Sequence, residues 1–186
     1  IIMGLEELFG RIEKRFGKEA VVGNDIKVDT VSSGSMAFDE ILGGGFALGR
    51  IHEIYGGNSC GKTSCALHLC ASIQKTLGKA VGYVDTEQAL DLEYAKALGV
   101  DLSRDKWIMS QPDSAEQALE IVREMLEVPE IGLVVLDSVA GLVPEAVLQG
   151  EAGDAKIALV ARLMSQQLSI LKNVCKKNGN ILLCIN

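Results

Sequence analysis

The hydrophobic positions near the N-terminus follow the spacing of one helical face. They are Leu5, Leu8, Phe9, Ile12 and Phe16. Residues three or four apart lie on the same side of an α-helix, and Gly17 is typical of the position just beyond a helix end. The pattern predicts an amphipathic helix whose apolar face would dock either on its own core or on a neighbouring subunit.

Beyond residue 50, short apolar runs alternate with helical patterns. The runs predict strands at Ile51–Tyr55, Ala80–Asp85, Trp107–Ser110, Leu133–Asp137 and Ile181–Ile185. The segments between them predict helices at Lys62–Leu77, Leu92–Leu98, Ala115–Leu126 and Ala155–Lys176. Such alternation is typical of the α/β class, a mostly parallel sheet with helices on its faces. The run Leu133–Leu136 is apolar at every position, which favours a central strand covered on both sides.

The segment between the first helix and this core is rich in charged and small residues. It covers Lys18–Ser35 and includes a possible strand, Ile26–Val31. A short helical run follows and ends at the triple glycine Gly43–Gly45. We therefore divide the chain into residues 1–31, a helix and linker for subunit docking, and residues 32–186, the core. Because the last predicted strand reaches the end of the sequence, we expect the sequence to be a fragment of a longer protein.

Composition narrows the class of protein. The 186 residues are 48% hydrophobic, which suffices for one packed core. No apolar run reaches the roughly 18 residues of a membrane span and no secretory signal is present, so we expect a soluble, cytoplasmic protein without a membrane partner. The five cysteines form no CxxC pair and are expected to be reduced, with Cys60 and Cys65 buried rather than bridged. The net charge of −7 argues against a uniformly basic nucleic-acid coat but is compatible with a local phosphate-binding patch.

A glycine-rich turn carries the clearest chemistry. Residues Gly56-Gly57-Asn58-Ser59-Cys60-Gly61-Lys62-Thr63 fit GxxxxGK[ST], the P-loop, between a predicted strand and a predicted helix. Its glycines let backbone N–H groups wrap a phosphate, and the helix start adds partial positive charge. Lys62 would reach the β- and γ-phosphates of a nucleotide, and Thr63 would bind Mg²⁺. The alternative, an ordinary turn with a solvated lysine, is disfavoured by the complete motif in this context.

Two carboxylates follow predicted strands. Asp137 ends the apolar run and would hold Mg²⁺ through water, although alone it would more readily be a cap or turn residue. Glu87 follows the strand Ala80–Asp85 and lies at the same C-terminal edge of the sheet, where ligands gather. It is the candidate base or water-orienting group for hydrolysis; from spacing alone, a solvated loop glutamate is an equal alternative.

The last predicted helix carries two further patterns. Its apolar stripe consists of Leu159, Leu163, Leu168 and Leu171 and is interpreted as core, not as a binding face. Its end carries Lys172, Lys176 and Lys177, which are interpreted as solvated cations near the negative end of the helix dipole.

Taken together, these motifs resemble those of the bacterial-type RecA recombinase family. The matching segments are GRIEKRFGK (Gly10–Lys18), SSGSMAFDEILGGGFALGRIHEIYG (Ser32–Gly56), VDTEQALDLEYAKALGVD (Val84–Asp101), SQPDSAEQALEI (Ser110–Ile121), VVLDSVAGLVP (Val134–Pro144), and GEAGD with ARLMSQ (Gly150–Asp154, Ala161–Gln166). Several motifs in this order are more specific than a P-loop alone. The resemblance implies a RecA-type P-loop NTPase fold whose N-terminal helix serves polymerisation.

The resemblance also implies roles for single residues. Glu87 would activate the attacking water and Lys62 would assist catalysis, while Asp91 and Tyr94 would contact adenine. The alternatives for the last two are a helix cap and a half-buried core tyrosine. The residues expected to hold ATP and Mg²⁺ include Gly56, Gly57, Asn58, Ser59, Cys60, Gly61, Lys62, Thr63, Ser64 and Asp137. The first DNA-binding loop is expected at Gly150–Ile157, with Gly150, Glu151, Gly153, Asp154 and Ile157 as its binding residues. Arg162 would contact the backbone of single-stranded DNA.

The function implied by the resemblance is that of a DNA-dependent ATPase. It would form helical filaments of identical subunits on single-stranded DNA and promote pairing with homologous duplex DNA in recombination and repair. One alternative is another RecA-fold motor, such as a ring helicase or a clock-type ATPase, which the GEAGD segment and Arg162 disfavour. A second alternative is a nucleotide-switched binding protein in which turnover is incidental.

Overall fold

The computed structural model describes residues 4–21, 28–150 and 155–186, with the backbone alone at residues 19 and 155–157. The elements are α1 (Leu5–Phe16), η1 (Lys18–Ala20), β1 (Thr30–Val31), α2 (Met36–Ile41), β2 (Phe46–Ala47), β3 (Ile51–Ile54), α3 (Lys62–Leu77), β4 (Ala80–Asp85), α4 (Leu92–Ala97), β5 (Trp107–Ser110), α5 (Ala115–Glu127), β6 (Ile131–Asp137), α6 (Glu145–Leu148), α7 (Ala155–Asn178) and β7 (Ile181–Ile185). The predicted order of strands and helices beyond residue 50 is confirmed.

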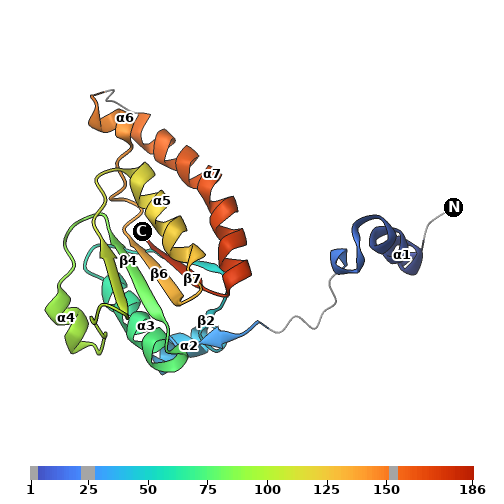
Figure 1. Cartoon of the computed structure of the whole chain (residues 1–186), viewed down its shortest axis with the longest axis horizontal. Helices are drawn as coiled ribbons and strands as arrows, with labels where there is room; N and C mark the ends of the chain where they lie inside the picture. The colour runs from blue at the N-terminus through green and yellow to red at the C-terminus, as the bar shows by residue number, and fades with distance from the viewer. Residues whose placement is uncertain (1–3, 22–27, 151–154) are drawn as a thin grey trace.

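Five strands form one parallel sheet in the order β3-β7-β6-β4-β5 (Figure 1). The run predicted to be a central strand is β6, which lies in the middle of this order. Its alternate residues Leu133 and Val135 belong to one hydrophobic cluster, and Val134 and Leu136 belong to another. The α/β prediction is therefore correct, including the burial of β6 on both faces.

Each cluster lies under its own helices. The first contains Leu67 and Ile73 of α3, and the second contains Leu119 of α5 with Leu171 of α7. Figure 1 shows α5 and α7 side by side on one face, with α3 on the other. The predicted apolar stripe of α7 is confirmed most fully at Leu171, which is buried, whereas its three other leucines are half-buried.

The strand register brings the carboxyl ends of the strands together. Asp85 of β4 lies opposite Asp137 of β6, and Ile185 of β7 lies opposite both Asp137 and Ile54 of β3. The loops that follow β3, β4 and β6 therefore start at one edge of the sheet. All the strand-end residues proposed for nucleotide chemistry follow these three strands.

Short elements near the N-terminal side of the core were not all predicted. β1 and β2 form a small antiparallel sheet. Of the predicted strand Ile26–Val31, Thr30–Val31 is a strand, Val28 and Asp29 are not, and Ile26 and Lys27 lie outside the described residues. Gly45 lies beside this pair with φ of +114°, and a Cβ there would clash with the Val31 carbonyl oxygen. The close backbone approach explains the last glycine of the triple.

The N-terminal helix forms as predicted. Figure 1 shows α1 apart from the sheet and its helices, and none of its residues is buried. Leu5 and Phe16 are 71% and 66% exposed, so these ends of the apolar face have little cover from the described residues. The division at residue 31 stays a prediction.

The five cysteines differ in how deeply they are buried. All five cysteines are free, but Cys60 is exposed and Cys65 half-buried, so their predicted burial is wrong for Cys60. Burial raises the pKa of Cys175 to about 11 and that of Cys184 to about 12.

Within the described residues, no helix is long and apolar enough to cross a membrane.

Candidate nucleotide-binding site

The turn between β3 and α3 forms an open polar hollow. Ser59 and Gly61 have φ of +58° and +94°, and α3 starts at Lys62 without a side-chain cap. The hollow is about 240 Å³ and is lined by the six residues from Ser59 to Ser64. Lys62 Nζ donates to the carbonyl oxygens of Gly56 at 2.8 Å and Gly57 at 2.9 Å. Uncapped N–H groups beside an ammonium group suit an anion such as phosphate.

Thr63 and Asp137 are in contact, although 74 positions separate them. Thr63 Oγ1 donates to Asp137 Oδ2 at 2.9 Å. The same oxygen accepts a 2.6 Å hydrogen bond from the Tyr83 hydroxyl. Burial, followed by the neighbouring Asp137 carboxylate, raises the pKa of Tyr83 far above its usual value, so the phenol remains a proton donor.

The donor set at this point fits Mg²⁺. Magnesium in nucleotide sites takes oxygen ligands, usually one or two carboxylates together with phosphate oxygens and water. Thr63 Oγ1 and the Asp137 carboxylate supply such oxygens beside the P-loop hollow. In the described part of the chain, no group of three or more His, Cys, Asp or Glu side chains is arranged to hold a metal ion.

Glu87 is exposed but is not simply solvated. Ser138 Oγ donates to its Oε1 at 2.5 Å, and Ser138 is itself buried. Thr86 and Ser138 exchange a second pair of hydrogen bonds, because Thr86 Oγ1 donates to the Ser138 carbonyl and accepts from its N–H. The loops after β4 and β6 are thereby joined at Glu87.

Asp85 fixes the start of the Glu87 loop. This buried carboxylate accepts from the N–H groups of Glu87 and Leu90 and from Gln111 Nε2, at 3.1 to 3.2 Å. Neither Asp85, Ser138 nor Tyr83 was singled out from the sequence. The partner of Tyr83 lies on another strand, so no signal within its own strand identifies it.

The two residues expected at adenine differ in their surroundings. Asp91 is the N-cap of α4, where it accepts from the N–H groups of Glu93 and Tyr94. Tyr94 is 43% exposed, and its hydroxyl lies 3.0 Å from Ser64 Oγ. The helix-cap alternative for Asp91 is therefore present, and Tyr94 lies against the P-loop helix, not in the core.

The segment expected to bind DNA is only partly described. Glu151, Gly153 and Asp154 lie outside the described residues, and Ile157 is described by its backbone alone. Gly150 follows α6 with φ of +92°, and Arg162 is exposed on α7. The lysines predicted to be solvated, Lys172, Lys176 and Lys177, are exposed.

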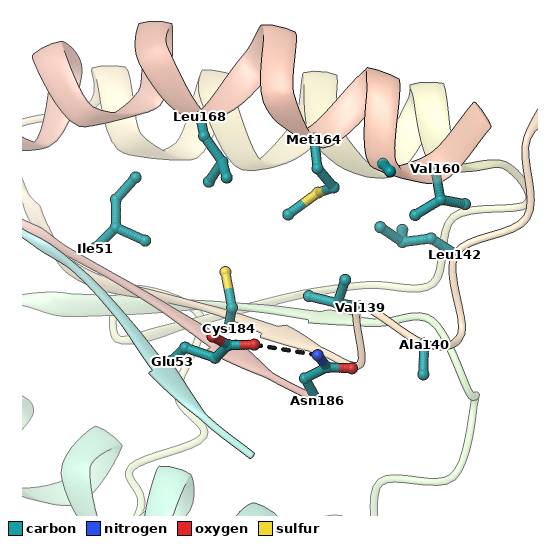
Figure 2. Close-up of a pocket in the computed structure, with 11 residues that line it drawn as sticks. Ile51, Glu53, Val139, Ala140, Leu142, Val160, Met164, Leu168, Cys184 and Asn186 are labelled. Carbon is teal, nitrogen blue, oxygen red and sulfur yellow. Dashed lines mark hydrogen bonds between the residues drawn. The ribbon is translucent and has the colours of Figure 1, made fainter. Parts of the chain in front are cut away.

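A larger apolar cavity of about 580 Å³ lies between α7 and the edge of the sheet (Figure 2). Leu168 and Met164 of α7 face Cys184 of β7 across it. At its floor Asn186 Nδ2 donates to Glu53 Oε1 at 3.1 Å, and the Asn186 carbonyl accepts from the N–H of Gly56. Asn186, which lines the cavity, is therefore hydrogen-bonded to the first residue of the P-loop.

Comparison with known proteins places this geometry in a family. Residues 3–186 match the family model described as the RecA N-terminal domain. The chain is 49% identical to Protein RecA of Latilactobacillus sakei subsp. sakei (strain 23K), over 98% of this chain and 52% of that protein. It is 49% identical to Protein RecA of Lactobacillus delbrueckii subsp. bulgaricus and 46% to that of Listeria monocytogenes, over 98% of this chain and 56% and 53% of those proteins. The chain thus spans about half the length of the curated relatives it matches. With a family model that covers nearly every residue and relatives identical at almost half of the aligned positions, the chain belongs to the RecA family.

Proposed function

We propose that this chain is the nucleotide-binding part of a DNA-dependent ATPase that forms filaments on single-stranded DNA and promotes homologous pairing and strand exchange in recombination and repair. The observation that carries the proposal is the convergence of Lys62, Thr63, Asp137 and Glu87 at one edge of the sheet in a member of the RecA family. A cytoplasmic location and assembly into homo-oligomers belong to the same proposal.

ATP would lie with its phosphates in the P-loop hollow. The N–H groups at the start of α3 and the Lys62 ammonium group would hold the phosphate oxygens. Lys62 would exchange its two carbonyl partners for phosphate, a stronger, charge-assisted pair. Ser64 and Tyr94, which already contact each other, would border the base.

Mg²⁺ would be held by Thr63 and Asp137 and would neutralise phosphate charge when bound. Glu87 would orient the attacking water and accept its proton. The Ser138 hydroxyl keeps one carboxylate oxygen of Glu87 in place, which leaves the other oxygen for the water.

DNA would be gripped through its phosphates by the segment around Gly150–Ile157 and by Arg162. Such contacts carry no sequence information and weaken as salt rises. Because Ser138 belongs to the loop that leads from β6 toward α6 and this segment, DNA binding could reach Glu87 through that loop and the Ser138–Glu87 hydrogen bond. This route offers a physical basis for DNA-stimulated turnover.

The test is ATP hydrolysis with and without single-stranded DNA at two salt concentrations. Lys62→Ala and Glu87→Gln should each lower turnover by about 100-fold or more. Lys177→Ala serves as the matched control. It removes an exposed lysine at the C-terminal end of α7, the end far from Arg162, and should leave turnover unchanged.

The outcomes separate the candidate functions. DNA-stimulated turnover that falls with rising salt and disappears in both site variants supports the recombinase proposal. ATP binding without turnover, whether or not DNA is present, would instead favour a nucleotide-switched binding protein.

A further inference from the structure

Tyr83 occupies an unusual place between the core and the nucleotide site. It is fully buried on the α3 side of β4, where it lies opposite Val135 of β6. Asp137 follows Val135 by two residues and therefore lies on the same face of the sheet. A long side chain at position 83 can reach such a diagonal neighbour on the next strand.

The hydrogen bond that results is short and charge-assisted. The Tyr83 hydroxyl donates to Asp137 Oδ2 at 2.6 Å, and Thr63 Oγ1 donates to the same oxygen at 2.9 Å. Among the described residues, both side-chain donors of this carboxylate converge on Oδ2, and no donor reaches Oδ1. A carboxylate has about four acceptor sites, so the two bonds fix its rotation while Oδ1 stays free to accept.

The phenol cannot readily turn away from this carboxylate. Its ring stacks on Trp107 of β5, with centroids 5.5 Å apart and planes at 30°, inside the α3-side cluster. Interlocked packing of this kind leaves a buried ring few alternative rotamers. The donor is therefore held in place by the packing of the core around its ring.

We propose that Tyr83 is a positioning residue for the Mg²⁺ site, which holds the Asp137 carboxylate in the orientation that the metal requires. The inference rests on the proposed function, because it gives Asp137 the role of a metal-holding group. Outer partners of this kind fix the orientation of the groups around a metal, and their loss typically weakens metal binding about 10- to 100-fold.

The test measures ADP binding by calorimetry, without turnover, across a series of Mg²⁺ concentrations and also in EDTA. In Tyr83→Phe, which removes only the hydroxyl, the Mg²⁺ concentration for half-maximal tightening of ADP should rise about tenfold. ADP affinity in EDTA should not change, because the P-loop hollow is untouched. A merely structural role would move both values or neither.

Two further variants make the result decisive. In an Asp137→Asn background, Tyr83→Phe should have no additional effect on the Mg²⁺ dependence, since the two residues act through one hydrogen bond. Val122→Ala removes buried volume from the opposite face, and should lower thermal stability without shifting the Mg²⁺ dependence.

An unchanged or lowered Mg²⁺ requirement in Tyr83→Phe would overturn this inference alone, provided that the wild-type chain binds ADP more tightly with Mg²⁺. An additive effect in the Asp137→Asn background would overturn it as well. If the wild-type chain binds no ADP under any of these conditions, the nucleotide-site proposal fails together with it.

Discussion

Cys60 shows how local geometry decides the chemistry of a residue. From the sequence, Cys60 is expected to be buried, because cysteine is a small apolar residue. In the structure it lines the open hollow of the glycine-rich turn and is exposed. Cys65, one turn into α3, is half-buried, and burial raises its pKa. The thiolate is the reactive species, so the exposed Cys60 is a better target than Cys65, whose thiol is half-buried.

We therefore predict that Cys60 reacts first with an alkylating reagent at neutral pH, and that ATP with Mg²⁺ slows this reaction. The phosphates would fill the hollow that Cys60 lines. Mass spectrometry of the labelled chain, with and without nucleotide, measures the protection. Buried Cys70 serves as the internal control and should stay unlabelled. Equal labelling of Cys60 in both conditions would contradict a nucleotide in this position.

The residues that the sequence missed share a physical reason. Thr63, Asp137 and Glu87 could be predicted because a motif or a strand end identifies each one. Tyr83 acts through Asp137 on another strand, and Ser138 acts through Glu87 in the loop after β4, at separations of 54 and 51 positions. Both contacts depend on the strand register. Register is set by packing of the whole sheet, so the sequence pattern of either strand alone does not contain it.

At the scale of elements, α1 is the part of the chain whose stability depends least on the core. Its hydrophobic residues recur on one face, yet Leu5, Phe9 and Phe16 remain exposed. Helical stability in proteins comes mainly from packing of such a face, and a helix of 12 residues alone is marginal in water. In the proposed filament, a second copy of the chain would cover this face.

We predict that Phe16→Asp abolishes self-association while the melting temperature of the core stays within about 2 °C, because substitutions at exposed sites typically change stability by less than about 0.5 kcal/mol. Glu7→Gln, on the opposite face of α1, is the matched control and should assemble normally. Analytical ultracentrifugation gives the oligomeric state and calorimetry the melting temperature. Unchanged assembly of Phe16→Asp would show that this face is not the contact.

The elements themselves were predictable to different degrees. Long periodic segments such as α3 and α5, and the apolar run of β6, were found with ends correct to within about two residues, because periodicity and burial agree there. The two-residue strand β2 and the four-residue α6 escaped prediction, since such short elements carry no period, whereas β1 lies within the predicted strand Ile26–Val31. These short elements are stabilised by contacts with neighbouring segments: β2 pairs with β1, and the start of α6 is hydrogen-bonded to α5.

At the scale of the whole molecule, the parallel sheet concentrates titratable groups in a dry interior. Cys70 of α3, Cys175 of α7 and Cys184 of β7 are buried on the two sides of the sheet, and burial raises the pKa of each thiol. The unfolded chain would lose these protons near the ordinary thiol pKa of 9.0, before the folded chain does. A raised folded-state pKa therefore stabilises the protein fully below pH 9, and that contribution is lost as pH rises further.

We accordingly predict that the free energy of unfolding falls between pH 8.5 and pH 10 under reducing conditions. Each buried thiol should contribute about 1 kcal/mol to the fall, about 3 kcal/mol for the three, because one pKa unit corresponds to about 1.36 kcal/mol. Urea unfolding across this range measures the fall. Cys70→Ala should be less stable at every pH, but its free energy of unfolding should fall by about one third less than that of the wild type, because one of the three thiols is gone. If wild type and Cys70→Ala lost the same free energy with pH, the alkaline sensitivity would have to arise from groups other than the thiols beside the sheet.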